Sequence, residues 1–133
     1  MTPEERAQFD AILEQVIESL PPRVREVLDE VPVIVLDRPD EQTLRQVGLT
    51  PDEAGDLCGL HTGTMRTERS IEEPWRLPSQ IHLFREGIIG IAGGICGHGA
   101  AERVREQIRV TLLHEVGHEL GLDEDQLWEL GYD

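Results

Sequence analysis

The chain has few aromatic residues, few cysteines and few basic residues. Aromatic side chains make up 4% of its 133 residues, so the core must be built mainly from leucine, isoleucine and valine. Its two cysteines, Cys58 and Cys96, lie too far apart for a CxxC metal site, and each is expected to be a free, buried thiol. Lysine and arginine number 12 against 27 aspartates and glutamates. This acidic excess argues against binding nucleic acid or an anionic membrane through bulk charge.

Long apolar runs are also absent. No segment approaches the roughly 18 apolar residues that a membrane span requires, and residues 1–22 lack the basic start of a secretory signal. We therefore expect a cytoplasmic protein. Neither a GxGxxG pattern nor a Walker lysine is present, so no nucleotide site of these types is predicted. The length is that of a single domain over residues 1–133.

Apolar spacing predicts helices at the N-terminus. Residues 3–19 carry apolar side chains at helical intervals, with Thr2 placed as N-cap and Glu5 as the residue that completes a capping box. Residues 23–30 predict a second, shorter helix, and residues 40–58 predict short helical turns.

Two segments have the composition of β-strands. VPVIVLD, residues 31–37, is β-branched and almost continuously apolar, which predicts a strand covered on both faces. QIHLFR, residues 80–85, alternates like a half-buried strand, and IIGIA, residues 88–92, is a candidate partner for it. The glycines of GGICGHG, residues 93–99, are interpreted as serving backbone freedom rather than phosphate binding.

The segment LLHEVGHELGLDEDQ, residues 112–126, contains the pattern HExxH. It lies on a helix predicted to begin near residue 100, with an apolar stripe that must be buried. The stripe comprises Val104, Ile108, Leu112, Leu113, Val116 and Leu120. His114 and His118 are four residues apart on this helix, so their imidazoles can converge on one ion. Glu115 reaches the same side and is the candidate general base that takes a proton from a metal-activated water.

Two histidines need a further protein ligand, and fifteen residues follow His118. Gly121 lies three residues on, where a left-handed conformation would reverse the chain at once. A carboxylate six residues past His118 would then fold over the metal, and that residue is Glu124. Asp123 is the second choice, and Glu129 is a candidate only if the helix resumes. The acidic run could equally begin a short final helix.

The motif region resembles known zinc peptidases. HEVGHELGLDE, residues 114–124, is similar to the extended HExxHxxGxx(H/D) signature of metzincins, with Glu124 in the register of the third ligand. The wider sequence resembles a family of small bacterial "possible zinc metallopeptidases", which are minimal zincin-like proteins. The similarity covers most of residues 57–133 and rests on CGLHTGTMRTERS, LPSQIHLFREGI, VTLLHEVGHELGL and the terminal LGYD.

The resemblance implies a compact α+β domain, in which a small mixed sheet packs against the HExxH helix and an N-terminal helix, with zinc in a shallow cleft. It implies peptide binding along an edge strand, for which residues 80–85 are the candidate. His61 and His82 are candidates for stabilising an oxyanion or supporting a ligand, although each could be an ordinary polar position. Two departures from metzincins stand out. Residue 124 is glutamate rather than histidine or aspartate, and no methionine follows the motif to form their methionine turn.

These observations together predict a zinc-dependent metallopeptidase. His114, His118 and Glu124 would be the metal ligands, and Glu115 would be the catalytic base. The expected partner is a peptide or protein substrate, without nucleic acid or membrane, and a monomer is favoured. The alternative function is a metal-binding, non-catalytic regulatory or interaction module of the same fold. A third hypothesis is a metal-free acidic interaction domain.

Overall fold

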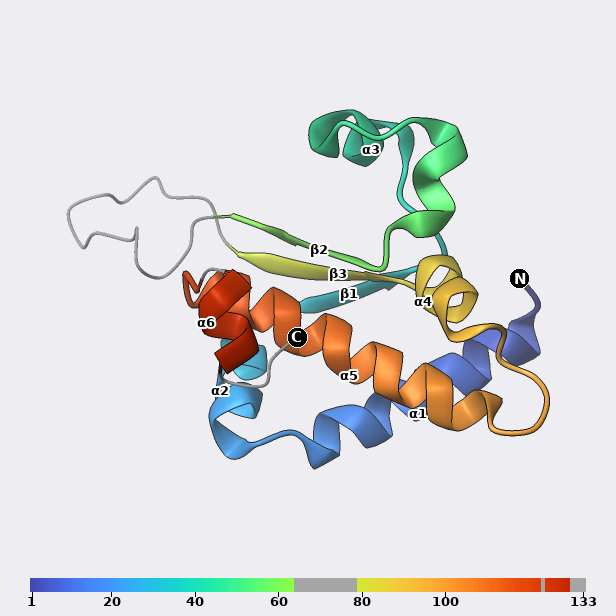
Figure 1. The fold of residues 1–133 in the computed structure, drawn as a ribbon, viewed down its shortest axis with the longest axis horizontal. Coiled ribbons are helices and arrows are strands. Elements are labelled where there is room, and N and C mark those ends of the chain that lie inside the picture. The colour runs from blue at the N-terminus through green and yellow to red at the C-terminus, as the bar shows by residue number, and fades with distance from the viewer. Residues whose placement is uncertain (64–78, 123, 130–133) are drawn as a thin grey trace.

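The computed structural model describes residues 1–63, 79–122 and 124–129, with the backbone alone for residues 124, 127 and 128. The elements follow in the order α1 (Pro3–Ser19), α2 (Pro22–Glu30), β1 (Val33–Leu36), α3 (Glu41–Val47), the 3-10 helix η1 (Pro51–Asp56), β2 (Gly59–Thr62), β3 (Gln80–Phe84), α4 (Arg85–Ala92), α5 (Ala100–Glu119) and α6 (Glu124–Glu129). Figure 1 shows α1, α2 and α5 on one side of a small sheet and α3 on the other. The α+β architecture is the one that the sequence predicts.

The first helix, α1, begins and ends where local sequence signals place it. The Thr2 hydroxyl accepts a hydrogen bond from the Glu5 amide, and the Glu5 carboxylate accepts one from the Thr2 amide, each at 3.1 Å. This is the capping box expected from the sequence, and it satisfies amide groups that have no partner within the helix. The helix ends before Pro21 and Pro22, and Pro22 then occupies the first turn of α2.

The sheet has the strand order β1–β3–β2. β3 pairs in parallel with β1 and antiparallel with β2, so that Ile81 lies opposite both Val33 and His61. The sheet is therefore mixed, as predicted, and β3 is its central strand. The expectation that residues 80–85 form an edge strand is wrong, because both hydrogen-bonding edges of β3 are occupied. The edge strand beside α5 is β2, and β2 falls in a segment whose polar, glycine-containing sequence gave little strand signal.

The other edge of the sheet is β1. The prediction that this strand is covered on both faces is wrong. Val33 and Val35 pack against the core, whereas Leu36 is 42% exposed at the end of the strand. A run of β-branched residues indicates a strand. It does not reveal whether a second partner covers the strand's free edge or its outer face.

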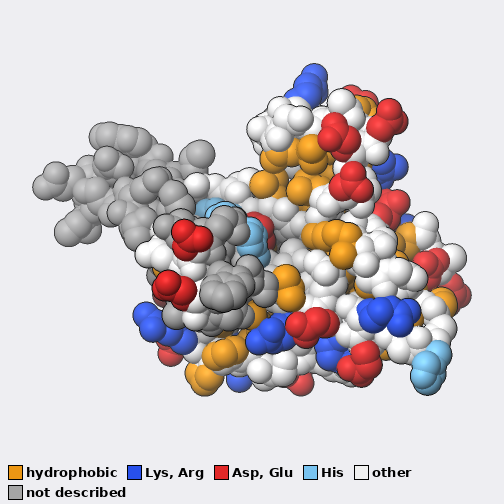
Figure 2. Space-filling model, viewed as in Figure 1, with side chains coloured by type: hydrophobic (Ala, Val, Ile, Leu, Met, Phe, Trp, Pro, Cys, Tyr) orange, Lys and Arg blue, Asp and Glu red, His pale blue; other side chains and the backbone are white. Residues whose placement is uncertain are grey.

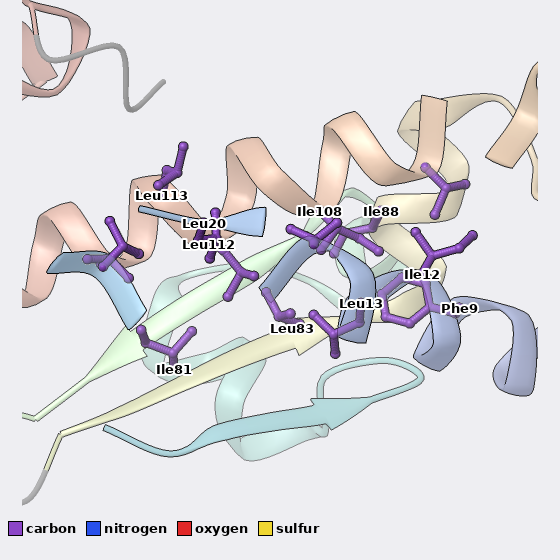
Figure 3. Close-up of a cluster of buried hydrophobic side chains, with 14 of the residues drawn as sticks. Phe9, Ile12, Leu13, Leu20, Ile81, Leu83, Ile88, Ile108, Leu112 and Leu113 are labelled. Atoms are coloured by element: carbon purple, nitrogen blue, oxygen red, sulfur yellow. The ribbon is translucent and has the colours of Figure 1, made fainter. Parts of the chain in front are cut away.

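The hydrophobic core lies between the sheet and the helices α1, α2, α4 and α5 (Figure 3). Every fourth residue of α5 from Val104 to Val116 is 0% exposed, and Ile81 and Leu83 of β3 are 0% exposed opposite them. The buried stripe on the motif helix is confirmed, with Leu120 partly buried at its end. Fully burying one such side chain contributes roughly 1.5–3 kcal/mol. Among the described residues, no helix has the length and apolar content to cross a membrane.

Residues 88–92 belong to α4 and do not pair with β3, so the strand expected there is wrong. Ile88 and Ile89 are buried, which satisfies the apolar pattern in a helix as well as it would in a strand. The helix packs against the chain before β2 through Gly87. A Cβ at Gly87 would lie 2.1 Å from the carbonyl oxygen of Leu57, so no larger residue fits without a shift of the backbone.

The loop that connects α4 to α5 depends on its glycines. Gly93, Gly94, Gly97 and Gly99 all have positive φ, between 74° and 111°. This confirms the interpretation that they serve backbone freedom. Arg103 holds the loop by donating from Nε to the carbonyl oxygen of Ala92 at 2.9 Å. Both cysteines are free, as expected, but Cys96 in this loop is exposed and Cys58 is only half-buried, so full burial was wrong for each.

An ion-pair cluster joins α1 to the ends of β1 and β3. Asp37 follows β1 and accepts hydrogen bonds from Arg6 Nε at 2.9 Å and from Arg85 Nη1 at 3.0 Å. Arg85 also pairs with Asp10 of α1. The hydrogen bond from Arg6, together with that from Arg85, holds the pKa of Asp37 below its ordinary value despite the opposing effect of burial.

Candidate metal centre

The two histidines of the motif meet at one point on α5. Nε2 of His114 lies 2.9 Å from Nε2 of His118. The ring centroids are 4.6 Å apart and the planes are inclined at 79°. Both residues are partly buried. Residues four apart on a helix lie one turn apart on the same face, and this spacing brings the two ring nitrogens together as the sequence predicts.

The separation of these nitrogens fits a shared cation. At ligand distances of about 2.0–2.1 Å and angles of roughly 90–109°, two imidazole nitrogens lie about 2.9–3.4 Å apart. Glu115 has a carboxylate oxygen that lies, with the donor atoms of the two histidines, in a group spanning at most 4.8 Å. Among the residues that the structure describes, these three side chains form the cluster that could hold a metal ion. Imidazole and carboxylate donors suit zinc.

A cleft bordered by α5 and β2 gives access to this cluster. Glu115 lines two adjoining cavities, one of about 280 Å³ on the side of His114 and one of about 390 Å³ on the side of His118. Glu115 itself is 7% exposed. Figure 2 shows histidine side chains at the surface of this face, close to an acidic side chain. A carboxylate that is nearly buried yet borders both cavities is well placed to act on a bound molecule.

The backbone of β2 comes very close to α5 at Gly59. A Cβ at this position would lie 2.7 Å from Cγ2 of Thr111 and 3.4 Å from Cγ of Glu115. The missing side chain therefore lets the strand lie directly over the motif helix. Sequence reasoning did not identify Gly59, since a single glycine at the start of a short strand carries no distinctive signal.

Cys58 lines the smaller cavity together with His114. Burial raises the pKa of its thiol to about 11, and the nearby Asp56 carboxylate adds to that effect. The thiol therefore stays protonated at neutral pH, which makes it a poor nucleophile.

The motif helix ends at Glu119, and the chain reverses at Gly121, as the sequence predicts. Gly121 has φ 77°, its amide donates to the carbonyl oxygen of His118 at 3.0 Å, and the Leu122 amide donates to that of Gly117 at 2.9 Å. These two bonds form a Schellman motif, in which a left-handed residue reverses the chain after a helix. The glycine is needed here because other L residues rarely adopt this conformation.

The chain resumes as a helix directly after this reversal. Glu124 is the first residue of α6, so the acidic run does begin a final helix. Asp123 and the side chain of Glu124 lie outside the described residues, and their proposed contacts with a metal stay predictions. Glu129 ends α6 with an exposed side chain and is not part of the cluster around His114 and His118.

The two additional histidines have different positions. His61 lies on β2, borders the larger cavity, and bonds through Nε2 to Oε2 of Glu119 at 2.7 Å. His82 lies on β3 between the core-facing Ile81 and Leu83, so its side chain points to the face of the sheet opposite α5. His82 is therefore remote from the candidate metal centre. Burial lowers its pKa.

Glu119 is a site residue that sequence reasoning missed. It is 0% exposed, directly follows His118, and lies four residues after Glu115. The repeated His-Glu pair in HEVGHE was the available signal, because it places a second carboxylate on the same helix face as the first.

Comparison with known proteins agrees with this geometry. A family model described as "Zincin-like metallopeptidase" matches residues 28–132, which include the sheet, the HExxH helix and α6. No curated protein matches the chain in a sequence search. Since the family model covers most of the chain, the protein belongs to the zincin-like metallopeptidase family.

Proposed function

We propose that this protein is a zinc-dependent peptidase in which His114, His118 and Glu124 hold the metal and Glu115 acts as general base. The observation that carries the proposal is the convergence of Nε2 of His114 and Nε2 of His118 to 2.9 Å, with the Glu115 carboxylate beside them. Family membership supports the same class of reaction. The position of the three side chains on a cleft wall supports a reactive role over a purely structural one.

Glu124 is proposed as the third ligand because of the path of the chain. The left-handed Gly121 ends α5 within one turn of His118, and Glu124 begins α6 only three residues later. A carboxylate at this position can return toward the two histidines without a further element of structure. Asp123 stays the second choice.

Zinc, when bound, lowers the pKa of a coordinated water and polarises the carbonyl group of a peptide bond. Glu115 accepts the proton of the attacking water on its carboxylate and later transfers it to the nitrogen of the leaving amine. The low exposure of Glu115 favours this role, because bulk water is largely kept from its carboxylate. Glu115 serves as base only if it is left free of the metal, and for that reason a separate carboxylate is assigned as the third ligand.

The proposed substrate is a peptide or protein segment lying along β2 in the cleft that Glu115 borders. β2 pairs with β3 along one edge, and within the described residues its other edge has no strand partner. An extended peptide could therefore add to the sheet beside Glu115 through main-chain hydrogen bonds. We propose that the protein acts as a monomer and that nucleic acid and membranes are not its partners.

The decisive experiment compares the wild type with Glu115→Gln. Both proteins should bind zinc in equal amount by metal analysis, and the variant should cleave peptides about 10²–10⁴-fold more slowly. Glu106→Gln is the matched control, because Glu106 lies exposed on the same helix and the chemical change is identical. Equal cleavage by the Glu115→Gln variant would rule out the proposed base.

The alternative, a metal-binding module without catalysis, predicts a different outcome. Zinc would bind to the same histidines, yet a broad peptide mixture would stay intact in the presence of the fully loaded wild type. Cleavage that stops on chelation and returns with added zinc would exclude this alternative. A metal-free interaction domain would bind no zinc and would show no loss of thermal stability with chelator.

A further inference from the structure

A buried polar bond ties the edge strand to the motif helix beside the candidate metal centre. Nε2 of His61 on β2 lies 2.7 Å from Oε2 of Glu119 on α5, and the two side chains are 7% and 0% exposed. A carboxylate removed from water is costly unless it is paired and hydrogen-bonded. The bond fixes the Nε2 edge of His61 and therefore the orientation of the ring.

The position of His61 follows from the matching repeats of strand and helix. Gly59 lies over Glu115, where a Cβ would come 3.4 Å from the Glu115 side chain. His61 is two residues further along the strand, a rise of about 6.6 Å. Glu119 is four residues, or about one helical turn, beyond Glu115, a rise of about 6 Å. Because the rise along β2 from Gly59 to His61 is close to the rise along α5 from Glu115 to Glu119, His61 faces the turn of α5 that follows Glu115.

This arrangement makes His61 part of the cleft wall rather than part of the metal cluster. It borders the cavity of about 390 Å³ together with Glu115 and His118. Its ring nitrogens do not join the described group of donor atoms that His114, Glu115 and His118 form within 4.8 Å. A peptide that reaches Glu115 through this cavity along β2 would therefore pass the His61 ring on the side of His118.

We propose that His61 is a substrate-contacting residue of this cleft and that Glu119 is the residue that positions it. The inference rests on the proposed peptidase function and extends it to the part of the cleft wall that β2 contributes. Glu119 holds one edge of the imidazole, and the remainder of the ring lines the cavity and contacts the peptide backbone. A contact that only joined β2 to α5 would not require a polar side chain at either position.

The test replaces both members of the pair by leucine, His61→Leu with Glu119→Leu. Replacing two buried, hydrogen-bonded polar side chains by apolar side chains of similar volume often leaves stability unchanged or raised, whereas replacing only one of them breaks the bond and keeps the other polar group buried. The double variant therefore separates the joining of β2 to α5 from contact with the substrate. We expect it to fold, to bind zinc with an affinity within about three-fold of the wild type, and to lose at least about 10-fold in kcat/KM.

A second readout does not depend on catalysis. In the Glu115→Gln background, a fluorescein-labelled peptide that the wild type cleaves should bind at least about 10-fold more weakly once the leucine pair is introduced. A pair that only joins the two elements predicts unchanged peptide affinity and unchanged kcat/KM in the stable double variant, and that result would overturn the proposal.

A milder variant keeps the proposal testable if the double variant does not fold. In His61→Gln the amide can still donate to Glu119, while the ring that lines the cavity is lost. We expect this variant to have normal zinc content and a kcat/KM at least about 10-fold lower than that of the wild type. Wild-type kinetics would overturn the inference. Failure of the proposed function gives a distinct result, since a zinc-loaded wild type that cleaves no peptide removes both proposals at once.

Discussion

Replacing Gly59 by alanine tests whether β2 must lie against α5 as closely as the structure places it. The added Cβ would stand 2.7 Å from Cγ2 of Thr111, 3.1 Å from the carbonyl oxygen of His82 and 3.4 Å from Cγ of Glu115. Carbon atoms in contact prefer about 3.5–4.0 Å, so strand and helix must separate by roughly an ångström. Overpacking of this kind costs about 1–3 kcal/mol. That exceeds the roughly 0.5–1 kcal/mol that alanine recovers in backbone entropy.

We therefore expect Gly59→Ala to lower the free energy of unfolding by about 1–2 kcal/mol. Urea unfolding followed by circular dichroism, on chelator-treated protein, measures this loss without a contribution from bound metal. Peptide cleavage by the zinc-loaded variant should fall as well, by at least about 10-fold, because displacement of β2 alters the cleft over Glu115.

Thr111→Ser provides the matched control. Serine lacks the Cγ2 atom that the new Cβ would strike, and it keeps the hydroxyl that donates to the carbonyl oxygen of Gln107 at 2.8 Å. Alone, it should cost about 0.8 kcal/mol for one buried methyl group. Combined with Gly59→Ala, it should recover roughly 1 kcal/mol relative to the sum of the single losses. Additive losses would refute the close approach of β2 and α5 at this point.

Three further changes test other parts of the structure. Gly87→Ala should lower the free energy of unfolding by about 2–3 kcal/mol, because its Cβ would strike the backbone at Leu57. Gly90→Ala on the same helix is the control: its Cβ meets open space, so it should be neutral or stabilising by up to about 1 kcal/mol. Equal effects of the two substitutions in urea unfolding would contradict the packing of α4. Gly121→Ala forces a φ of 77° on a residue with a side chain. The substitution should lower the free energy of unfolding by about 1–2 kcal/mol and weaken zinc binding in a titration. Unchanged zinc affinity would argue against a metal ligand after the chain reversal. The pKa of Asp37 lies below its ordinary value of 3.8, first because of the hydrogen bond from Arg6. The stability from this carboxylate is present above that ordinary value and is lost as pH falls through the lower folded-state pKa. Asp37→Asn should therefore flatten the decline in the free energy of unfolding below about pH 4, and parallel pH profiles would show that the bond contributes nothing.

The parts of the fold that depend on near neighbours in sequence could be predicted. The capping box of Thr2 and Glu5, the buried stripe of α5 and the left-handed Gly121 each involve residues within a few positions of one another. The convergence of His114 and His118 has the same origin, since helical geometry alone brings them together.

The features that depend on distant segments could not be predicted in this way. β3 is the central strand of the sheet, although its alternation of apolar and polar residues suits an edge strand equally well. Residues 88–92 belong to α4, which packs on the chain near Leu57, and no local pattern encodes that contact. The bond between His61 and Glu119 joins residues 58 positions apart, and only the register of β2 on α5 reveals it.

In the proposed site, two histidines and one carboxylate close on a single zinc ion beside Glu115. Anomalous diffraction from crystals grown with zinc, recorded on both sides of the zinc absorption edge, tests this arrangement. We predict one peak at about 2.0–2.1 Å from Nε2 of His114 and from Nε2 of His118, with Glu124 completing the protein ligands. Crystals in excess zinc that show no anomalous peak between the two imidazoles would contradict zinc binding at His114 and His118.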